Sequence, residues 1–261
     1  MKTMSLLGRI LYRNIFFVVF FLLILFSPSL SSAESLNQCV YENPLFHNFY
    51  IDKLFAFSSS ADFDSKITTL NVSSYKQQRA LSCECAAAAV VSQFSDTTQF
   101  SESSCLDALS YYEAPLQNDV WGDPDTQFVG DVDGSQLRRT GWGVFATPLV
   151  KILHSRGLSA TETSFASIGD ITYAISNGKP VVVWVTSYFM PCIPVTWKTP
   201  ENRTISSCLN EHTVVVTGFT GSRRNPKSIQ VMDVADGKTS WLCIGKFMRV
   251  WEAMDSKMLV L

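Results

Sequence analysis

The sequence predicts an α+β domain whose helices come first along the chain and whose antiparallel sheet comes last. Three observations lead to this expectation. An alanine run follows Cys83, which favours a helix. Residues 181–185 form an unbroken run of β-forming side chains. Two more such segments, 212–219 and 228–234, flank a stretch rich in turn-forming residues.

Three helices are expected in the first half of the chain, and start signals place the first and the third. Ser82 is the expected N-cap of a helix that begins at Cys83. A second helix is expected over 104–112. Thr147 and Pro148 supply a cap and a first-turn proline for the third helix. The first half of the chain is therefore expected to be mainly helical.

The fourth helix leads into the strands. It starts with a capping box formed by Ser167 and Asp170. The apolar run 181–185 follows it and is expected to be a strand buried on both faces. The segments 212–219 and 228–234 are expected to pair as an antiparallel hairpin, because only a short turn-rich stretch separates them.

Composition and charge narrow the function classes. The chain of 261 residues has 46% hydrophobic and 17% charged residues, which is too apolar for intrinsic disorder. A formal net charge of −2 leaves no excess of Lys and Arg to neutralise a phosphate backbone. We therefore expect a folded protein without a nucleic-acid partner.

The N-terminal segment has the pattern of a secretory signal. It carries Lys2, Arg9 and Arg13 before the apolar run 15–26, and small residues lead to Ala33. The apolar run is shorter than the roughly 20 residues that a spanning helix needs. We expect cleavage after Ala33 and a secreted or otherwise extracytoplasmic protein. The alternative is an uncleaved segment that anchors the protein in a membrane.

The chain is expected to contain one folded domain. No repeat with a period of about 20 to 50 residues divides the part after the signal, and neither does a Gly/Ser-rich linker. Residues 1–33 are the expected signal, 34–70 an irregular lead-in and 71–261 the domain. Membrane contact is expected only if the first segment is retained, and the oligomeric state is left open.

Seven cysteines in an exported chain leave at least one thiol unpaired. Cys192 and Cys208 bracket a polar loop and are expected to form a disulfide. Cys83 is the expected free thiol, with a disulfide role as its alternative, and Cys85 is expected to face away and to pair. No His or Cys pair stands at zinc spacing, so we expect no metal and no cofactor. The cysteines whose pairing is otherwise left open are Cys39, Cys105 and Cys243.

Cys83 and His212 are the candidate nucleophile and general base. The first turn of a helix has unpaired N–H groups and the positive end of the helix dipole, so we expect a lowered thiol pKa. A hairpin loop over 220–227 places Asp233 opposite Val214. His212 is then the diagonal neighbour of Asp233 on the same face, roughly 7 Å away at the Cα atoms. Asp233 is thus expected to orient the imidazole, provided that the register does not slip by one residue.

Acyl transfer also needs a hydrogen-bond donor for the developing oxyanion. Gln77 precedes Cys83 by six residues, and its side-chain amide is expected to point to the same position as the backbone N–H of Cys83. Gln78 is the alternative donor. With the imidazole and the carboxylate, these groups make up the machinery of a thiol hydrolase.

Several motifs accompany these residues: LSCE at 81–84, WGDP at 121–124, FVGD at 128–131, GV at 143–144, GKPV at 178–181 and HTVVVTG at 212–218. With them the sequence resembles papain-like cysteine peptidases of the bacteriocin-processing kind, peptidase family 39. It is most similar to the stand-alone secreted relatives called peptidase family 39-like proteins. The resemblance covers about residues 70–255. It implies a papain-like fold with Cys83 as nucleophile, His212 as base, Asp233 as orienter and Gln77 as oxyanion donor.

Three functions follow from these residues. The first is a secreted cysteine peptidase that cleaves peptide amide bonds through a Cys-His-Asp triad and an acyl-enzyme at Cys83. The second uses the same triad as a cell-wall peptide amidase or acyl transferase. The third is a non-catalytic peptide-binding surface module. The expected partner is a peptide or protein in each case, and the cleavage specificity is left open.

The Gly- and Asp-rich stretch 121–131 has two interpretations. Its aspartates shape a substrate cleft or bind a cation, or they hold a structural loop through hydrogen bonds to backbone amides. The spacing is not that of a calcium-binding EF-hand, which needs a glutamate at loop position 12. His47 and His154 have no partner in the pattern and are assigned no role.

Overall fold

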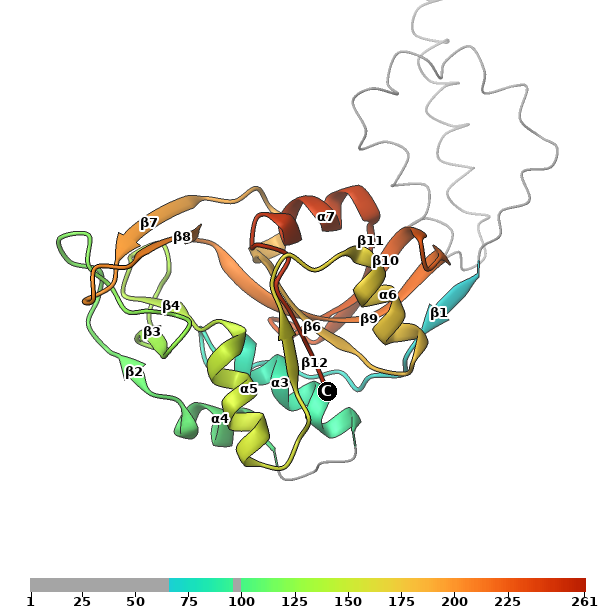
Figure 1. Ribbon diagram of the computed structural model, residues 1–261, viewed down its shortest axis with the longest axis horizontal. Helices are drawn as coiled ribbons and strands as arrows, with labels where there is room; N and C mark the ends of the chain where they lie inside the picture. Colours follow the sequence, from blue (N-terminus) through green and yellow to red (C-terminus); the bar gives the residue numbers. More distant parts are fainter. Residues whose placement is uncertain (1–65, 96–99) are drawn as a thin grey trace, which may run out of the picture. The chain divides into compact units, whose positions relative to one another are not determined.

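The structure is a computed structural model that describes residues 66–95 and 100–261 (Figure 1). The expected signal at 1–33 and most of the lead-in expected at 34–70 lie outside the described residues, as does Cys39. Within the described part of the chain, no helix has the length and apolar character needed to cross a membrane.

The expected helices are present, with differences at their ends. The first begins at Cys83 as expected, and the alanines at 86–89 on it are fully buried. The fourth begins with the expected capping box of Ser167 and Asp170. The last helix, α7, and a short 3-10 helix, η1, have no counterpart among the expected elements. The helices are α3 Cys83–Phe94, α4 Glu102–Ala108, α5 Ala146–Ser155, α6 Ile168–Ser176, η1 Ser187–Phe189 and α7 Ile244–Glu252.

The second helix does not match the expected range of 104–112. It covers Glu102–Ala108, because Ser101 forms a capping box with Ser104 and starts the helix earlier. It stops before Tyr111–Tyr112, which pair with β3 as strand β2. Pairing with a segment farther along the chain therefore overrides local helix propensity here.

Two side chains expected to cap helices have other partners. Phe145 is the N-cap of α5, and Thr147 donates its hydroxyl hydrogen to Glu162 Oε1 at 2.8 Å. Ser82 does stand at the N-cap position of α3, but its hydroxyl donates to the Glu102 carboxylate at 2.5 Å. In both places a tertiary hydrogen bond replaces the local cap.

The main sheet is antiparallel and has the strand order β11-β10-β9-β6-β12-β5, with β1 paired to β9. β6 is buried along its whole length, as expected for 181–185. β1 lies within the segment that was expected to be irregular. The strands are β1 Ile67–Thr69, β5 Thr161–Thr163, β6 Val181–Thr186, β9 Glu211–Ser222, β10 Asn225–Asp233, β11 Lys238–Cys243 and β12 Met258–Val260.

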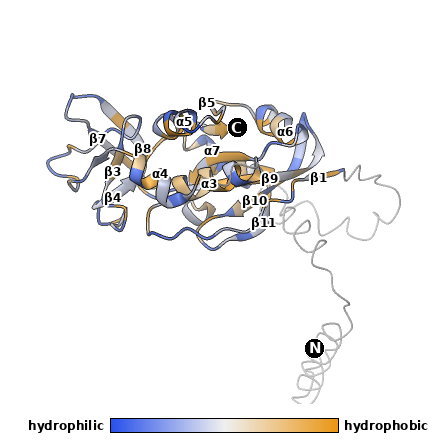
Figure 2. Cartoon of the chain, turned by 90° about the horizontal axis from the view of Figure 1, so that it is seen from below, coloured by the Kyte–Doolittle hydropathy of each residue, from blue (hydrophilic) through white to orange (hydrophobic). Residues whose placement is uncertain are grey.

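Alternate side chains of β6 pack into two cores, one on each face of the sheet. Val182 and Trp184 belong to the core that includes α3 and α5. Val181, Val183 and Val185 belong to the core that includes α6 and α7. Figure 2 shows apolar residues gathered along these central strands and polar residues on the outer loops. The sheet is thus covered on both faces, which keeps its apolar side chains from water.

β9 and β10 form the expected hairpin, but with a tighter turn than the expected loop over 220–227. The strands continue to Ser222 and Asn225, which pair with each other. Two register shifts along the hairpin cancel, so Asp233 still lies opposite Val214. The predicted register is therefore confirmed at the end of the hairpin that carries the candidate site.

A small sheet and a second hairpin lie at the end of the domain away from β1 and β11 (Figure 1). Trp197 packs against Trp121 and Trp142 there, with ring centroids 5.5 and 5.6 Å apart. The indole N–H group of each ring donates to a backbone carbonyl, which fixes the rings in place. These strands are β2 Tyr111–Tyr112, β3 Phe128–Gly130, β4 Gly141–Gly143, β7 Pro194–Lys198 and β8 Thr204–Cys208.

Disulfides join Cys85 to Cys105 and Cys192 to Cys208, and Cys243 is also disulfide-bonded. The Cys192–Cys208 bridge was expected from the sequence. Cys85 pairs as expected and ties α3 to α4. Cys83 is free, so its alternative role as a disulfide partner is wrong.

Removing the Cys85–Cys105 disulfide should lower the free energy of unfolding by about 3 kcal/mol. The bridge spans a sequence separation of 20 residues, and without it the unfolded chain gains the entropy of that open loop. We expect this loss in urea denaturation of the Cys85→Ala/Cys105→Ala double variant, compared with the unmodified protein. A loss below about 1 kcal/mol would contradict the prediction.

Candidate active site

Cys83 is the first residue of α3 and is buried against the start of β9. Its residue surface is 4% exposed. The thiol donates a hydrogen bond to Glu84 Oε2 at 3.3 Å. The backbone N–H of Thr213 on β9 hydrogen-bonds to the sulfur. The candidate nucleophile thus contacts the residue that directly follows His212.

The pKa of the Cys83 thiol is raised, which corrects the expectation of a lowered one. Burial is the largest cause, and the negative charges of Glu84 and Glu211 add to it, while the Thr213 N–H acts in the opposite direction. A thiolate at this position loses its hydration and faces carboxylates, and these effects exceed the benefit of a helix N-terminus. Cys83 is therefore a neutral thiol in the resting protein.

His212 and Asp233 form a hydrogen-bonded pair. The Nε2 atom of His212 lies 2.7 Å from Oδ1 of Asp233, and the backbone N–H of Ala235 donates to the same oxygen at 2.9 Å. Burial pushes the pKa of Asp233 upward, but the hydrogen bond and charge of His212 and the Ala235 N–H hold it below its ordinary value. Asp233 is thus ionised at neutral pH, and the other ring nitrogen of His212, Nδ1, is left for a different partner.

The candidate nucleophile and base are near each other but not hydrogen-bonded. Within residues 66–95 and 100–261, no hydrogen bond joins the sulfur of Cys83 to the imidazole of His212. The charge of His212 does lower the pKa of Glu84, which places the imidazole within electrostatic range of the start of α3. Catalytic hydrogen bonds are often long in enzymes without substrate and shorten when substrate binds.

The amide groups considered as oxyanion donors have other partners. Gln77 donates from Nε2 to the backbone carbonyls of Arg79 at 2.8 Å and Ala80 at 3.0 Å. Its Oε1 atom is buried and has no hydrogen-bond partner among the described residues. Gln78 donates from Nε2 to the hydroxyl of Tyr75 at 3.2 Å. The role of either glutamine at an oxyanion therefore stays a prediction.

A buried carboxylate that the sequence pattern missed holds the segment before Cys83. Glu102, on α4, is fully buried. It accepts hydrogen bonds from the hydroxyls of Ser82 at 2.5 Å and Tyr75 at 2.9 Å. It also accepts one from the backbone N–H of Gln78 at 2.9 Å. The loop that leads to the candidate nucleophile is thus positioned by a residue on the next helix.

Two further acids beside the candidate nucleophile were not expected. Glu84 is 1% exposed and Glu211 is 2% exposed. One oxygen of each and the sulfur of Cys83 lie within 4.8 Å of one another. Each acid directly adjoins a candidate catalytic residue in the sequence, Cys83 or His212. This adjacency in the sequence was the one feature that could have indicated that both acids lie near the candidate site.

Burial raises the pKa of both acids. The pKa of Glu84 rises from 4.5 to about 7, although the backbone N–H of Val144, the Cys83 thiol and the charge of His212 all act to lower it. The pKa of Glu211 is raised well above its ordinary value by burial and by the charge of Glu84. Both groups therefore resist ionisation near neutral pH.

Sulfur and carboxylate oxygens also bind metals, so this cluster is the place to consider one, although none was expected from the sequence. Its oxygens already accept hydrogen bonds. Val144 N–H donates to Glu84 at 2.7 Å, and Gln136 Nε2 and the Thr213 hydroxyl each donate to Glu211 at 3.2 Å. A cation would have to displace these donors, and we describe the group as a hydrogen-bonded acid cluster.

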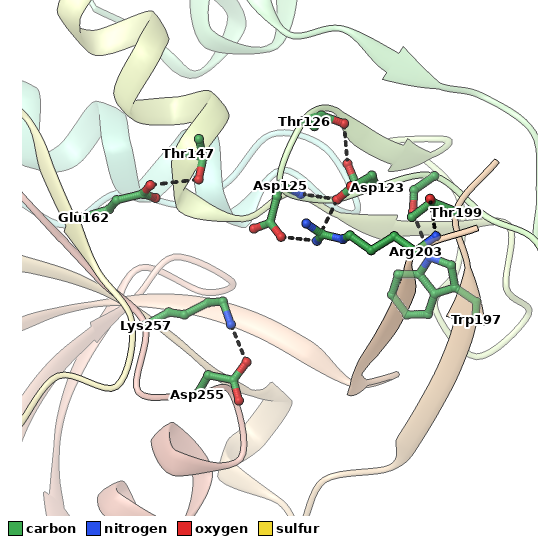
Figure 3. Close-up of polar contacts among 11 residues, drawn as sticks. Asp123, Asp125, Thr126, Thr147, Glu162, Trp197, Thr199, Arg203, Asp255 and Lys257 are labelled. Carbon is green, nitrogen blue, oxygen red and sulfur yellow. Dashed lines mark hydrogen bonds and ion pairs between the residues drawn. The ribbon is translucent and has the colours of Figure 1, made fainter. Parts of the chain in front are cut away.

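The acidic stretch 121–131 is held by internal hydrogen bonds, as Figure 3 shows. Asp123 Oδ1 accepts from the backbone N–H of Asp125 at 3.0 Å. Arg203, from the turn between β7 and β8, forms ion pairs with both aspartates, at 3.0 Å to Asp123. These contacts favour the structural interpretation of the loop.

Comparisons with known proteins point to one family. The sequence profile of the Peptidase_C39 like family matches residues 69–258. The "Uncharacterized protein YvpB" of Bacillus subtilis (strain 168) is 30% identical over 142 residues, which are 54% of this chain and 53% of that protein. The chain thus spans about half the length of this curated relative.

A solved structure shares the fold. It is described as a "putative C39-like peptidase from Bacillus anthracis" and has 23% sequence identity to this chain. The alignment covers 75% of this chain and 96% of that one, with a TM-score of 0.64. The helices and the antiparallel sheet on which they pack thus form the papain-like α+β fold that the sequence predicted.

Stability should fall as the pH rises from about 5 to about 8, because Glu84 has a pKa near 7 in the fold against 4.5 when unfolded. In this window the folded state binds more protons than the unfolded state, so raising the pH favours unfolding. We expect the melting temperature to decline across the window, and to decline less in Glu84→Gln. The exposed Glu201→Gln variant should keep the full decline, and a Glu84→Gln profile identical to it would contradict the assignment.

Proposed function

The chain belongs to the Peptidase_C39 like family, and from this premise we propose that it is a cysteine peptidase with a Cys83–His212–Asp233 triad. One observation carries the proposal. The free thiol of Cys83, at the first turn of α3, contacts β9 at Thr213, beside a histidine already paired with a carboxylate. A nucleophile, a base and a group that orients the base are the parts of a thiol hydrolase.

The proposed reaction begins with the neutral thiol. As substrate binds, Nδ1 of His212 takes the proton of Cys83, and the thiolate forms a bond to the carbonyl carbon of the peptide. The imidazolium then returns its proton to the amine as the C–N bond breaks, which leaves an acyl-enzyme. Water, deprotonated by the same imidazole, releases the acid and restores the thiol. Asp233 keeps the imidazole oriented throughout through its bond to Nε2.

Gln77 is the proposed oxyanion donor in this reaction. Its Nε2 atom is bonded to the carbonyls of Arg79 and Ala80 in the structure. Taking up the new role requires that the amide leave these carbonyls when a tetrahedral intermediate forms. The backbone N–H of Cys83 is the second donor, because the first N–H groups of a helix have no partner within it.

We further propose that the protein acts outside the cytoplasm on a peptide or protein substrate. Disulfides persist in oxidising compartments, and the described chain contains them in both α3 and β8. The expected signal at 1–33 agrees with that location.

Cys83→Ala and His212→Ala should each lower the rate of peptide hydrolysis at least about a thousandfold, because the nucleophile or its base is lost. The measurement is cleavage of a peptide library followed by mass spectrometry. His154→Ala is the matched histidine control and should keep full activity, since the imidazole of His154 lies 2.7 Å from the carbonyl oxygen of Ala160 and not at the candidate site. Unchanged turnover in Cys83→Ala would end the proposal.

The same library separates the peptidase from the other functions expected from these residues. A cell-wall peptide amidase or acyl transferase would act on purified wall fragments and leave the library intact. A peptide-binding module would turn over neither substrate, and its affinity for peptides would survive in Cys83→Ala.

Gln77→Ala should lower kcat by about a hundredfold with little change in KM, because an oxyanion donor acts mainly in the transition state. Gln78→Ala is the matched comparison and should leave kcat nearly unchanged. The reverse ranking of the two variants would assign the donor to Gln78. Equal, small losses in both would remove either glutamine from the mechanism.

A further inference from the structure

Glu84 and Glu211 form an unusual pair, because two acids approach each other in the protein interior. They come from α3 and β9, and both are almost fully buried. Neither forms a salt bridge with a Lys or Arg among the described residues. One oxygen of each acid lies within 4.8 Å of the other. Without a cation nearby, ionising both carboxyl groups has a high electrostatic free energy, as in other buried acid pairs.

Neighbouring residues provide hydrogen-bond donors and space for the two carboxyl groups. Glu84 Oε1 receives the backbone N–H of Val144, and Glu211 receives the side chains of Gln136 and Thr213. A Cβ atom at Gly143 would lie 2.2 Å from Glu84 Oε1 and 3.1 Å from Glu211 Oε2. Only a glycine, with its φ of +142°, leaves room for both carboxyl groups.

The pair also contacts the proposed nucleophile. The thiol of Cys83 donates to Glu84 at 3.3 Å, so the proton that must leave the sulfur points to a carboxyl group. The titratable groups around the pair are few, because β4 and β6 carry none. They are Cys83 on α3, His212 on β9 with Asp233 behind it on β10, Tyr111 on β2, and the exposed Arg138 and Arg139 near Gln136.

We propose that Glu84 and Glu211 share one proton, and that this proton decides whether Cys83 can become a thiolate. With the proton present, the acid O–H can donate to the sulfur and the pair carries one negative charge. When the proton passes to water, the pair carries two charges and Cys83 is held as a thiol. The two acids are thus positioning residues that act on the reaction through the nucleophile.

This inference is about the site of the proposed peptidase, but it is independent of turnover. The raised pKa values of Glu84 and Glu211 agree with it, since both acids resist ionisation. Because thiol alkylation needs only a thiolate, it tests the shared proton even if no peptide is cleaved. Failure of the peptidase assay and failure of this proposal are therefore distinguishable.

The experiment measures iodoacetamide alkylation of Cys83 against pH in the full protein, with a chelator present and the labelled peptide quantified by mass spectrometry. At a pH of about 5.5, Glu84→Gln and Glu211→Gln should match the unmodified protein within about twofold. At a pH of about 8.5, each should react about tenfold faster, because one negative charge beside the sulfur is gone. The double variant should be faster still at a pH of about 8.5, because both negative charges beside the sulfur are gone.

Glu201→Gln, at an exposed position, is the control and should follow the unmodified protein at both pH values. Equal rates in all variants at the higher pH would overturn the proposal. So would a tenfold faster reaction of the single variants already at a pH of about 5.5, because both acids of the unmodified protein would then be ionised there and share no proton.

A second readout needs no variant and covers the case in which the substitutions prevent folding. Infrared titration of the unmodified protein should show a carboxylic acid C=O band that persists at a pH of about 6 and disappears near or above neutrality. Ordinary Asp and Glu side chains are already ionised at a pH of about 6, so the band reports only carboxyl groups with a raised pKa. Absence of such a band at a pH of about 6 would overturn the proposal.

Discussion

The contact between the N-terminus of α3 and the first residues of β9 is the interaction on which the candidate site depends. Alanines at 86–89 are fully buried, and their small side chains let the helix lie close to the sheet. That closeness brings the sulfur of Cys83 to the backbone of Thr213. The Cys85–Cys105 disulfide and the Glu102 carboxylate secure the same helix start from the side of α4.

Competing electrostatic effects decide the state of the thiol. A helix N-terminus stabilises a thiolate by about 1 kcal/mol at an exposed site. Desolvation of a fully buried group shifts a pKa by up to several units, and each unit corresponds to about 1.4 kcal/mol. At Cys83, burial and two neighbouring acids raise the thiol pKa by more than the helix N-terminus lowers it. The side chain is therefore a thiol rather than a thiolate in the resting protein. In the proposed mechanism, activation requires that His212 take the thiol proton of Cys83 while the proposed shared proton stays on Glu84 and Glu211.

Much of the fold followed from local patterns, and so did part of the site. The fully apolar run at 181–185 became the buried strand β6, and the capping box at Ser167 started α6. The position of Asp233 opposite Val214 was also predicted correctly, although the hairpin geometry used to predict it differs from the observed one. The turn is tighter than expected, and two irregularities in the strands compensate one another. Patterns of polarity define which face a residue occupies, but they do not reveal bulges whose effects cancel.

By itself, the sequence determined the start of α3 at Cys83, the buried strand at 181–185 and the pairing of the segments 212–219 and 228–234. These features depend on neighbours within a few residues, where propensity and periodicity act. Only the tertiary structure decided that Cys85 bonds to Cys105, that the amide of Gln77 turns to its own loop, and that Glu84 meets Glu211. Such contacts join distant segments, and their energies arise from burial that exists only once the chain has folded.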